Sequence, residues 1–248
     1  MSLYRRLFPE DNQTRLWVLI DPDKAPHNEL VKVAMNAEEG GASAILIGGS
    51  LLFNDAFDQV VQSIKRDVNI PVILFPGSSR QISRYADGIL FMSLLSGRNP
   101  QFLIGEQVQA APIISSIGLP AISTAYLLIE SGTTTSAEFV SNTRPIPRTK
   151  PLIAAAHAQA AELLGMKVIY LEAGSGAKMP VPPEMVKVVS QSVSIPVIVG
   201  GGIINSEGAK TAAKNGARVI VVGTAIEEKG SKVISEIAAA LFTTVVNG

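Results

Sequence analysis

The sequence predicts a single parallel (β/α)8 barrel, an α/β fold in which eight strands alternate with helices and close on themselves. Two patterns lead to this prediction. Short apolar runs rich in β-branched residues recur eight times, and segments with helical character separate most of them without a linker or low-complexity stretch. The length fits as well, because barrels of this class run to about 250 residues as one unit. We therefore expect one domain over residues 1–248.

The expected strands are apolar without strict alternation, which is the pattern of strands covered on both faces of a parallel sheet. Their shortness and their flanking glycines favour strand over buried helix. The eight predicted strands are residues 16–20, 43–47, 71–75, 88–92, 121–129, 167–171, 196–199 and 218–222.

Helical segments are expected between most of these strands. In the first of them, Asn28 is placed to cap a helix with Leu30, Val33 and Ala37 on one face, and Gly40 follows as a stop signal. The remaining predicted helices are residues 55–66, 101–116, 151–164, 183–192, 205–216 and 231–245.

Two connections depart from this alternation. Residues 76–87 are too few for an ordinary crossover helix with its two loops, since a crossover normally takes at least ~10–12 residues, so a stunted or missing helix is expected there. Residues 130–150 are rich in Thr, Ser and Pro and form a long connection on the face where the strands end. Two interpretations of this second segment stay open, a mobile lid and a surface loop without a role.

Composition limits the partners and the location. Hydrophobic residues make up 47% of the chain and charged residues 17%, which favours a large buried core. The 21 basic and 21 acidic residues balance, so no overall field would attract nucleic acid or anionic lipid. The absence of cysteine excludes thiolate chemistry and is compatible with a reducing cytoplasm. Because the sequence has no signal-peptide pattern and no apolar run of ~18 residues, a soluble cytoplasmic protein is expected.

Glycine-rich turns follow the last three predicted strands. Bare backbone N–H groups in such turns can approach an anion closely, and barrels of this class frequently bind phosphate after strands seven and eight. The first turn also carries Glu172, which is expected to act in the barrel mouth as a general base or hydroxyl ligand, or else only as a helix cap or ion-pair partner. The predicted phosphate site is made of Glu172-Ala173-Gly174-Ser175-Gly176, Gly200-Gly201-Gly202 and Gly223-Thr224.

Oxygen-bearing residues follow the first two predicted strands. Asp21 comes directly after strand one, and Ser50 follows strand two. A carboxylate and a hydroxyl from adjacent strands are hard ligands that suit Mg²⁺, which usually keeps several waters and shares phosphate oxygens with its substrate. As a bare motif, however, Asp-Pro-Asp is also typical of a simple turn.

In this order along the chain, the strand ends resemble the geranylgeranylglyceryl phosphate synthase family, and the resemblance spans almost the whole sequence. The motifs that carry it are Asp21-Pro22-Asp23-Lys24, Ile47-Gly48-Gly49-Ser50, Leu94-Leu95-Ser96-Gly97-Arg98-Asn99-Pro100, Tyr170-Leu171-Glu172-Ala173-Gly174-Ser175-Gly176 and the Gly200 and Gly223 loops. The resemblance implies a Mg²⁺-dependent prenyltransferase of ether lipid biosynthesis. Such an enzyme joins the C3 hydroxyl of sn-glycerol 1-phosphate to geranylgeranyl diphosphate and releases diphosphate.

The resemblance also implies roles for single residues, with Asp21 and Ser50 holding Mg²⁺. The residues implied to bind glycerol phosphate are Tyr170, Leu171, Glu172, Ala173, Gly174, Ser175, Gly176, Gly200, Gly201, Gly202, Gly223 and Thr224. Glu172 is expected to orient the hydroxyl and accept its proton, while Tyr170 either lines the path of the allylic cation or serves only in packing. The shorter branch of the family carries a lysine where this chain has Leu19. This chain therefore resembles the longer branch, and a phosphate role for strand one is left unsupported.

A long apolar groove is required for the prenyl chain, and a missing helix at residues 76–87 would leave one side of the barrel open for it. The segment Arg98-Asn99-Pro100 with Phe102 is a candidate subunit contact, because members of this branch look like dimers or hexamers. Transient membrane contact would suit a lipid product.

Other residues and other functions compete with this hypothesis. His27 and His157 lack ligand spacing and are expected to be structural, and Trp17 is expected in the core. An isomerase or synthase of the phosphate-binding barrels in amino-acid biosynthesis, a non-catalytic phosphate-binding barrel, and a prenylglyceryl phosphate synthase with another chain length all remain open. The combination of Asp21 and Ser50 with Glu172 favours prenyl transfer.

Overall fold

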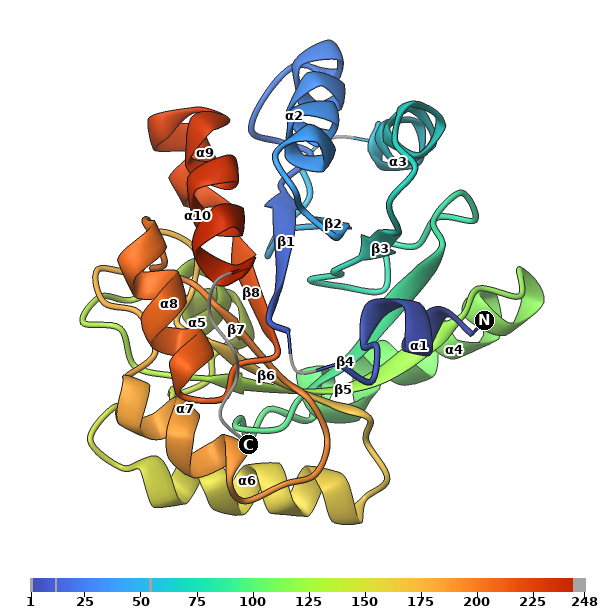
Figure 1. Cartoon of the computed structure of the whole chain (residues 1–248). Helices are drawn as coiled ribbons and strands as arrows, with labels where there is room; N and C mark the ends of the chain where they lie inside the picture. The colour runs from blue at the N-terminus through green and yellow to red at the C-terminus, as the bar shows by residue number, and fades with distance from the viewer. Residues whose placement is uncertain (1, 12, 54, 243–248) are drawn as a thin grey trace.

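The computed structural model describes residues 2–11, 13–53 and 55–242, which form a closed barrel of eight parallel strands (Figure 1). Neighbours along the chain pair all the way around, and β1 closes the ring against β8. The strands are β1 (Arg15–Ile20), β2 (Ala44–Ile47), β3 (Val72–Leu74), β4 (Gly88–Leu94), β5 (Ala121–Leu128), β6 (Val168–Glu172), β7 (Val197–Gly200) and β8 (Val219–Val222). The predicted fold class is confirmed, and each strand overlaps its predicted segment.

Helices cover most of the outside of the barrel. They are α1 (Leu3–Leu7), α2 (His27–Glu39), α3 (Phe57–Asp67), α4 (Glu106–Ser116), α5 (Ser136–Ser141), α6 (Pro151–Leu163), α7 (Pro183–Ser190), α8 (Ser206–Lys214), α9 (Thr224–Lys229) and α10 (Lys232–Phe242). A π-helical turn, η1 (Gln101–Gly105), takes the first part of the predicted helix 101–116. The end of the predicted helix 231–245 lies outside the described residues. Across the described part of the chain, none of the helices has the length and apolar character needed to cross a bilayer.

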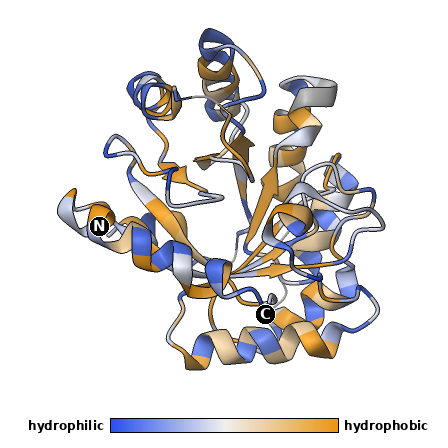
Figure 2. Cartoon of the chain, turned by 180° about the vertical axis from the view of Figure 1, so that it is seen from behind, coloured by the Kyte–Doolittle hydropathy of each residue, from blue (hydrophilic) through white to orange (hydrophobic). Residues whose placement is uncertain are grey.

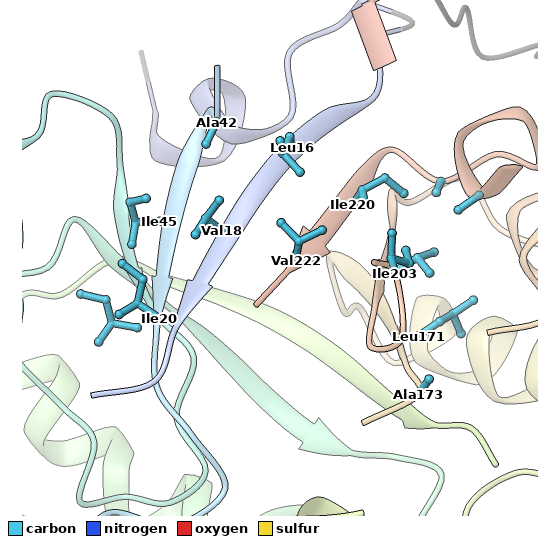
Figure 3. Packing of buried hydrophobic residues seen from close by; sticks show 14 of the residues in the cluster. Leu16, Val18, Ile20, Ala42, Ile45, Leu171, Ala173, Ile203, Ile220 and Val222 are labelled. Atoms are coloured by element: carbon cyan, nitrogen blue, oxygen red, sulfur yellow. The ribbon is translucent and has the colours of Figure 1, made fainter. Parts of the chain in front are cut away.

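Successive residues along each strand point alternately into two buried hydrophobic layers. Because both layers are apolar, the strands form continuous apolar runs in the sequence and appear mostly orange in Figure 2. Leu16, Val18 and Ile20 of β1 belong to the outer layer that packs under the helices (Figure 3). The residue between them, Trp17, belongs to the inner layer within the barrel and is fully buried. The prediction that Trp17 lies in the core is confirmed.

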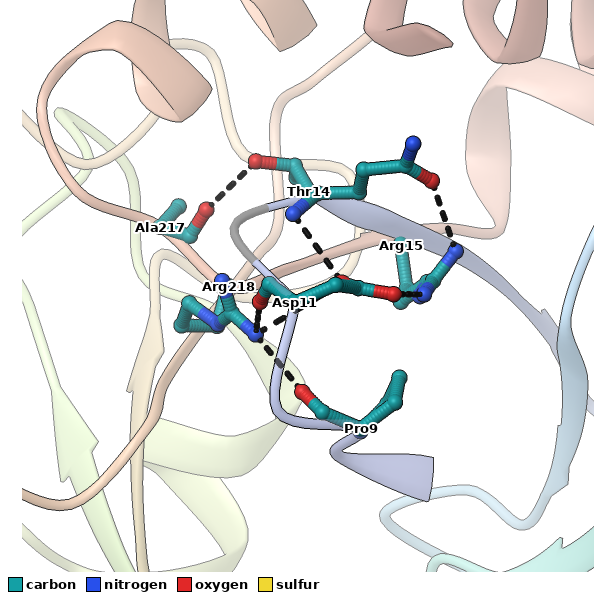
Figure 4. A network of polar contacts seen from close by, with 7 residues as sticks. Pro9, Asp11, Thr14, Arg15, Ala217 and Arg218 are labelled. Atoms are coloured by element: carbon teal, nitrogen blue, oxygen red, sulfur yellow. Dashed lines mark hydrogen bonds and ion pairs between the residues drawn. The ribbon is translucent and has the colours of Figure 1, made fainter. Parts of the chain in front are cut away.

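The N-terminal segment closes the lower end of the barrel, at the start of the strands. The rings of Phe8 and Trp17 lie 5.5 Å apart in the inner layer. Arg218, at the foot of β8, donates to the carbonyl oxygen of Pro9 over 3.0 Å and also to that of Asp11, whose carboxylate pairs with Arg15 (Figure 4). These contacts hold the residues before β1 across the end of the barrel, and we call this segment the floor.

The connection between β3 and β4 contains no helix: residues 75–87 are all described, and none is helical (Figure 1). The expectation of a missing helix is confirmed. Side-chain hydrogen bonds hold this strap, which we define as residues 75–87. Its Ser83 hydroxyl donates to Asp58 of α3, and its Asp87 accepts from Lys65 Nζ over 2.8 Å.

Residues 130–150 fold over the barrel mouth instead of projecting from it. Ile129 and Ile146 form a parallel bridge, and Thr135 caps α5 by accepting from the Glu138 amide. Asn99 donates to the carbonyl oxygen of Ser141 over 2.7 Å, so part of the predicted subunit-contact segment makes contacts within the chain. Opening of this segment as a lid stays a prediction.

Candidate active site

A cavity of about 390 Å³ lies at the C-terminal ends of the strands and gathers most of the predicted site residues. Those that line it are Asp21, Ser50, Tyr170, Glu172, Ser175, Gly176, Gly201, Gly202, Gly223 and Thr224. Leu171 and Ala173 instead turn into the outer hydrophobic layer (Figure 3), so their side chains face away from the cavity. Gly174 and Gly200 stand just behind its wall, against Glu172.

Glu172, the last residue of β6, is a buried carboxylate with 5% of its surface exposed. Its Oε1 accepts a hydrogen bond from the Gly174 amide over 2.6 Å. Burial raises the pKa of Glu172 to about 7, because the low-polarity surroundings disfavour the charged form more than the Gly174 amide favours it. A carboxyl group with this pKa can take up and give back a proton near neutral pH.

Only glycine fits at position 201, next to the Glu172 carboxylate. A Cβ atom there would lie 2.3 Å from Glu172 Oε1 and 2.6 Å from the Gly174 amide nitrogen, and the backbone adopts φ +80°. The glycine loop after β7 and the turn after β6 therefore pack backbone against carboxylate, which leaves little space for water between them.

An aromatic cluster lies next to Glu172 in the barrel interior. The Tyr170 ring stacks on Tyr126 with centroids 5.5 Å apart and lies 5.1 Å from Phe75. Burial and then the charge of Glu172 raise the pKa of Tyr170. Tyr126 of β5 and Phe75, directly after β3, also line the cavity but were missed from the sequence.

The ends of β1 and β2 meet across the cavity from β6. A Cβ atom on Gly49 would lie 3.1 Å from Asp21 Oδ2, so the backbone that leads to Ser50 touches the Asp21 carboxylate. No group of three or more His, Cys, Asp or Glu side chains with metal-binding geometry occurs among the described residues. Two hard oxygen ligands fit Mg²⁺, which takes its remaining ligands from water and phosphate oxygens.

Basic side chains are scarce in the wall of the larger cavity, and His157 lies outside it. Lys24 is the one basic side chain among the described residues that line the cavity, and its signal was its place in the Asp21-Pro22-Asp23-Lys24 motif. Leu19 also lines the cavity, where a lysine stands in the shorter branch. His157 lies on α6, where its Nδ1 is 2.7 Å from the Ile153 carbonyl oxygen.

A second, mainly apolar cavity of about 120 Å³ adjoins the first on the side where the helix is missing. The two share Gly49, Ser50, Phe75, Tyr126 and Ala137 as wall residues. The second wall also includes residues of the strap, Phe91 and Met92 of β4, Phe102 of η1, and Glu106, Gln107 and Ala110 of α4. The missing helix therefore coincides with an apolar cavity, and a long groove for a prenyl chain stays a prediction.

The sequence of this chain matches the PcrB family over residues 11–241. The chain belongs to the PcrB family. This PcrB chain is similar to a geranylgeranylglyceryl phosphate synthase from Flavobacterium johnsoniae, with 49% identity over 218 residues, 88% of this chain and 90% of that protein. The family resemblance predicted from the strand-end motifs is confirmed.

Solved structures agree with this membership of the PcrB family. The wild-type GGGPS from Thermoplasma volcanium superimposes with a TM-score of 0.92 and 37% identity over 100% of both chains. The (S)-3-O-geranylgeranylglyceryl phosphate synthase from Thermoplasma acidophilum, solved in complex with its substrate sn-glycerol-1-phosphate, gives a TM-score of 0.90 and 36% identity, covering 97% of this chain and 96% of that one.

Proposed function

We propose that this chain transfers the geranylgeranyl group of geranylgeranyl diphosphate to the C3 hydroxyl of sn-glycerol 1-phosphate, giving geranylgeranylglyceryl phosphate and diphosphate. The observation that carries the proposal is the buried Glu172 carboxylate in the glycine-lined cavity, which shares part of its wall with an adjoining apolar cavity. This arrangement suits one small anionic substrate and one long apolar substrate that meet at a base. The names of the relatives at about half identity support the same reaction.

The acceptor would bind on the β6–β8 side. Backbone amides of Gly201, Gly202 and Gly223 with the Thr224 hydroxyl line the cavity where its phosphate would lie. Ser175 lies on the same side, in position for the glycerol hydroxyls. With Leu19 in place of the lysine, this pocket would rely on backbone donors and on Lys24.

In the reaction, the C3 hydroxyl oxygen of the acceptor forms a bond to C1 of the prenyl chain while the C1–O bond to diphosphate breaks. The hydroxyl proton passes to Glu172, whose pKa of about 7 suits a general base at neutral pH. Tyr170 and Tyr126 present aromatic rings beside the reacting centre, where they would stabilise positive charge on C1.

The donor would bind on the β1–β4 side. Asp21 and Ser50 would hold Mg²⁺, which when bound neutralises charge on the departing diphosphate. The apolar cavity under the strap would take the first part of the prenyl chain, and Phe91, Phe102 and Ala110 would exclude water from it.

The test is to incubate the purified protein with Mg²⁺, sn-glycerol 1-phosphate and labelled farnesyl, geranylgeranyl or heptaprenyl diphosphate. We expect a butanol-extractable prenylglyceryl phosphate and one diphosphate per product, with geranylgeranyl diphosphate preferred. Replacement of the acceptor by sn-glycerol 3-phosphate is the stereochemical control. A barrel that binds glycerol phosphate but releases no diphosphate with any donor would refute the proposal.

The quaternary state and location belong to the same proposal. Large apolar side chains exposed on α4 and α6, such as Val108, Leu152 and Leu163, support a homo-oligomer, a dimer or a hexamer. Light scattering of the purified protein distinguishes these states from a monomer. A cytoplasmic location, expected from the cysteine-free sequence, is tested by cell fractionation.

A further inference from the structure

We infer that Gln81 is a positioning residue for the metal side of the site, an inference that rests on the proposed function. Gln81 is fully buried in the strap. Its Nε2 donates to the carbonyl oxygen of Gly49 over 2.8 Å, and its Oε1 accepts from the Gly49 amide over 3.2 Å. One side chain therefore satisfies both backbone groups of Gly49, the residue directly before Ser50.

Regular strand pairing stops at Gly48, whose amide donates to the Ile20 carbonyl oxygen of β1 over 3.2 Å. The last hydrogen bond between β2 and β3 runs from the Phe75 amide to Ile47 over 2.8 Å, so the strand ladder ends before Gly49. A Cβ atom on Gly48 would lie 1.9 Å from the Phe75 carbonyl oxygen. Because glycines are needed for this close backbone contact, the loop has no side chains of its own to fix it until Ser50. The carboxamide of Gln81 replaces the missing rung of the ladder.

Gly49 in turn packs on the Asp21 carboxylate, since a Cβ atom added to Gly49 would lie only 3.1 Å from Oδ2. The position of Ser50 relative to Asp21 thus depends on the Gly49 peptide, and the Gly49 peptide depends on Gln81. A partner of this kind, which orients a ligand without touching the metal, typically contributes about 10–100-fold to metal affinity.

The strap also joins this loop to the apolar cavity. Ser79 and Ile82, which flank Gln81, line that cavity, and Glu106 of α4 accepts from the Ser79 amide over 2.6 Å. The strap therefore contributes both to the wall of the apolar cavity and, through Gln81, to the support of the Gly49 backbone before Ser50. Gln81 should act on the donor side and leave the acceptor side unchanged.

The test compares Gln81→Leu, which removes both hydrogen bonds to Gly49, with Ser83→Ala, which removes the two hydrogen bonds of the Ser83 hydroxyl in the same strap, outside the walls of both cavities. Calorimetry with Mg²⁺ and inorganic diphosphate should show binding weakened ~10-fold or more in Gln81→Leu and unchanged in Ser83→Ala. The KM for sn-glycerol 1-phosphate should stay within ~2-fold of wild type in both. In the metal-free protein, amide exchange of peptide 47–53 should be faster in Gln81→Leu only.

Gln81→Met is the second variant, because it keeps the length of the side chain and removes both hydrogen bonds to Gly49 without adding a charge. It should weaken Mg²⁺–diphosphate binding in the same direction. Wild-type binding in the folded Gln81 variants, or an equal loss in Ser83→Ala, would overturn the inference. If wild-type protein forms no prenyl product while the Gln81 effect on Mg²⁺–diphosphate binding persists, the proposed function fails and the positioning role stands.

Discussion

The two sides of the barrel mouth are built in different ways. The β6–β8 side is made of short glycine turns between strands and helices, and its contacts are backbone against carboxylate, as at Gly201 and Glu172. The β1–β4 side lacks a helix, and side chains such as Gln81 and Glu106 tie its strap to neighbouring elements. We call the glycine turns of the β6–β8 side, with Gly201, Gly202 and Gly223, the backbone cradle. A site of this kind suits a small substrate of fixed shape. A wall held by side chains can vary in length and lining without disturbing the barrel, which suits a long chain.

The largest effect is expected at the junction of the two sides. Glu172→Gln removes the proton acceptor and should lower kcat by ~10²–10⁴-fold, the usual contribution of a general base. In wild type, kcat/KM should rise with pH and level off above about pH 7, because Glu172 must be deprotonated to act. Steady-state kinetics across pH check both results, and a Glu172→Gln variant with near wild-type turnover would exclude this role.

A second substitution tests whether metal binding belongs to the donor side alone. Asp21→Asn should reduce turnover by ~10²-fold or more at ordinary Mg²⁺ concentrations, because the carboxylate charge is lost from the metal site. Asp23→Asn is the matched control, since Asp23 lies two residues away and is not part of the cavity wall. Equilibrium binding of sn-glycerol 1-phosphate should be unchanged in both variants. Equal losses in the two variants would argue against a specific role for Asp21.

A third substitution addresses the backbone cradle. Gly201→Ala places a methyl group against Glu172 and should raise the KM for sn-glycerol 1-phosphate ~10–100-fold while lowering kcat. Gly165→Ala is the control, because Gly165 has a similar φ of +83° but a methyl group there would have nothing within 4 Å. Both variants lose about 1 kcal/mol of stability to the left-handed backbone, so thermal unfolding separates strain from the clash. Similar kinetics in the two variants would contradict the cradle.

A smaller effect is expected in the apolar cavity. Ala110→Leu fills part of its wall and should raise the KM for geranylgeranyl diphosphate ~5–10-fold, in line with the ~1–3 kcal/mol typical of one or more misplaced methyl groups. The KM for sn-glycerol 1-phosphate should not change, and Ala110→Ser should behave as wild type. A change confined to the acceptor KM would place the prenyl chain elsewhere.

The last expected effect is on stability instead of on kinetics, and it depends on pH. Because the pKa of Glu172 is raised from 4.5 to about 7, the folded state holds a proton that the unfolded state releases between these values. Wild-type stability should therefore fall as pH rises through this window. Glu172→Gln does not titrate, so its stability relative to wild type should rise across this window by on the order of 3 kcal/mol and then stay constant. Urea unfolding at pH 4.5, 6 and 8 measures this; a difference independent of pH would refute the raised pKa.

The sequence predicted the parts of the site that follow from strand ends. A carboxylate or a glycine turn after a strand of a barrel must face the mouth, so Asp21, Glu172 and the Gly201 loop could be placed from the sequence. Tyr126 could not, because it lies inside a long apolar strand and its inward direction depends on the pairing of β5 with β6. Leu171 illustrates the same limit, since it neighbours two site residues but alternation turns it outward.

Other elements carried too little local signal. Gln81 lies in a segment without periodicity, and its partner Gly49 is 32 residues away, so only the tertiary structure brings them together. The π-helical turn η1 differs from an α-helix by one residue per hydrogen bond, a difference that apolar spacing does not report. The five-residue helix α1 is too short for a helical period, although it delivers Leu7 and Phe8 to the barrel interior.

Phe8 and Trp17 close the end of the barrel where the strands begin, so the barrel opens only at the end where the strands finish. Every molecule that enters must leave by the same rim, and the rim is shared by both substrates. Under the proposed function, the lipid product would occupy both cavities, so it would have to leave before the next acceptor could bind against Glu172. Turnover would then be sequential, because a new cycle could begin only after the lipid product has dissociated.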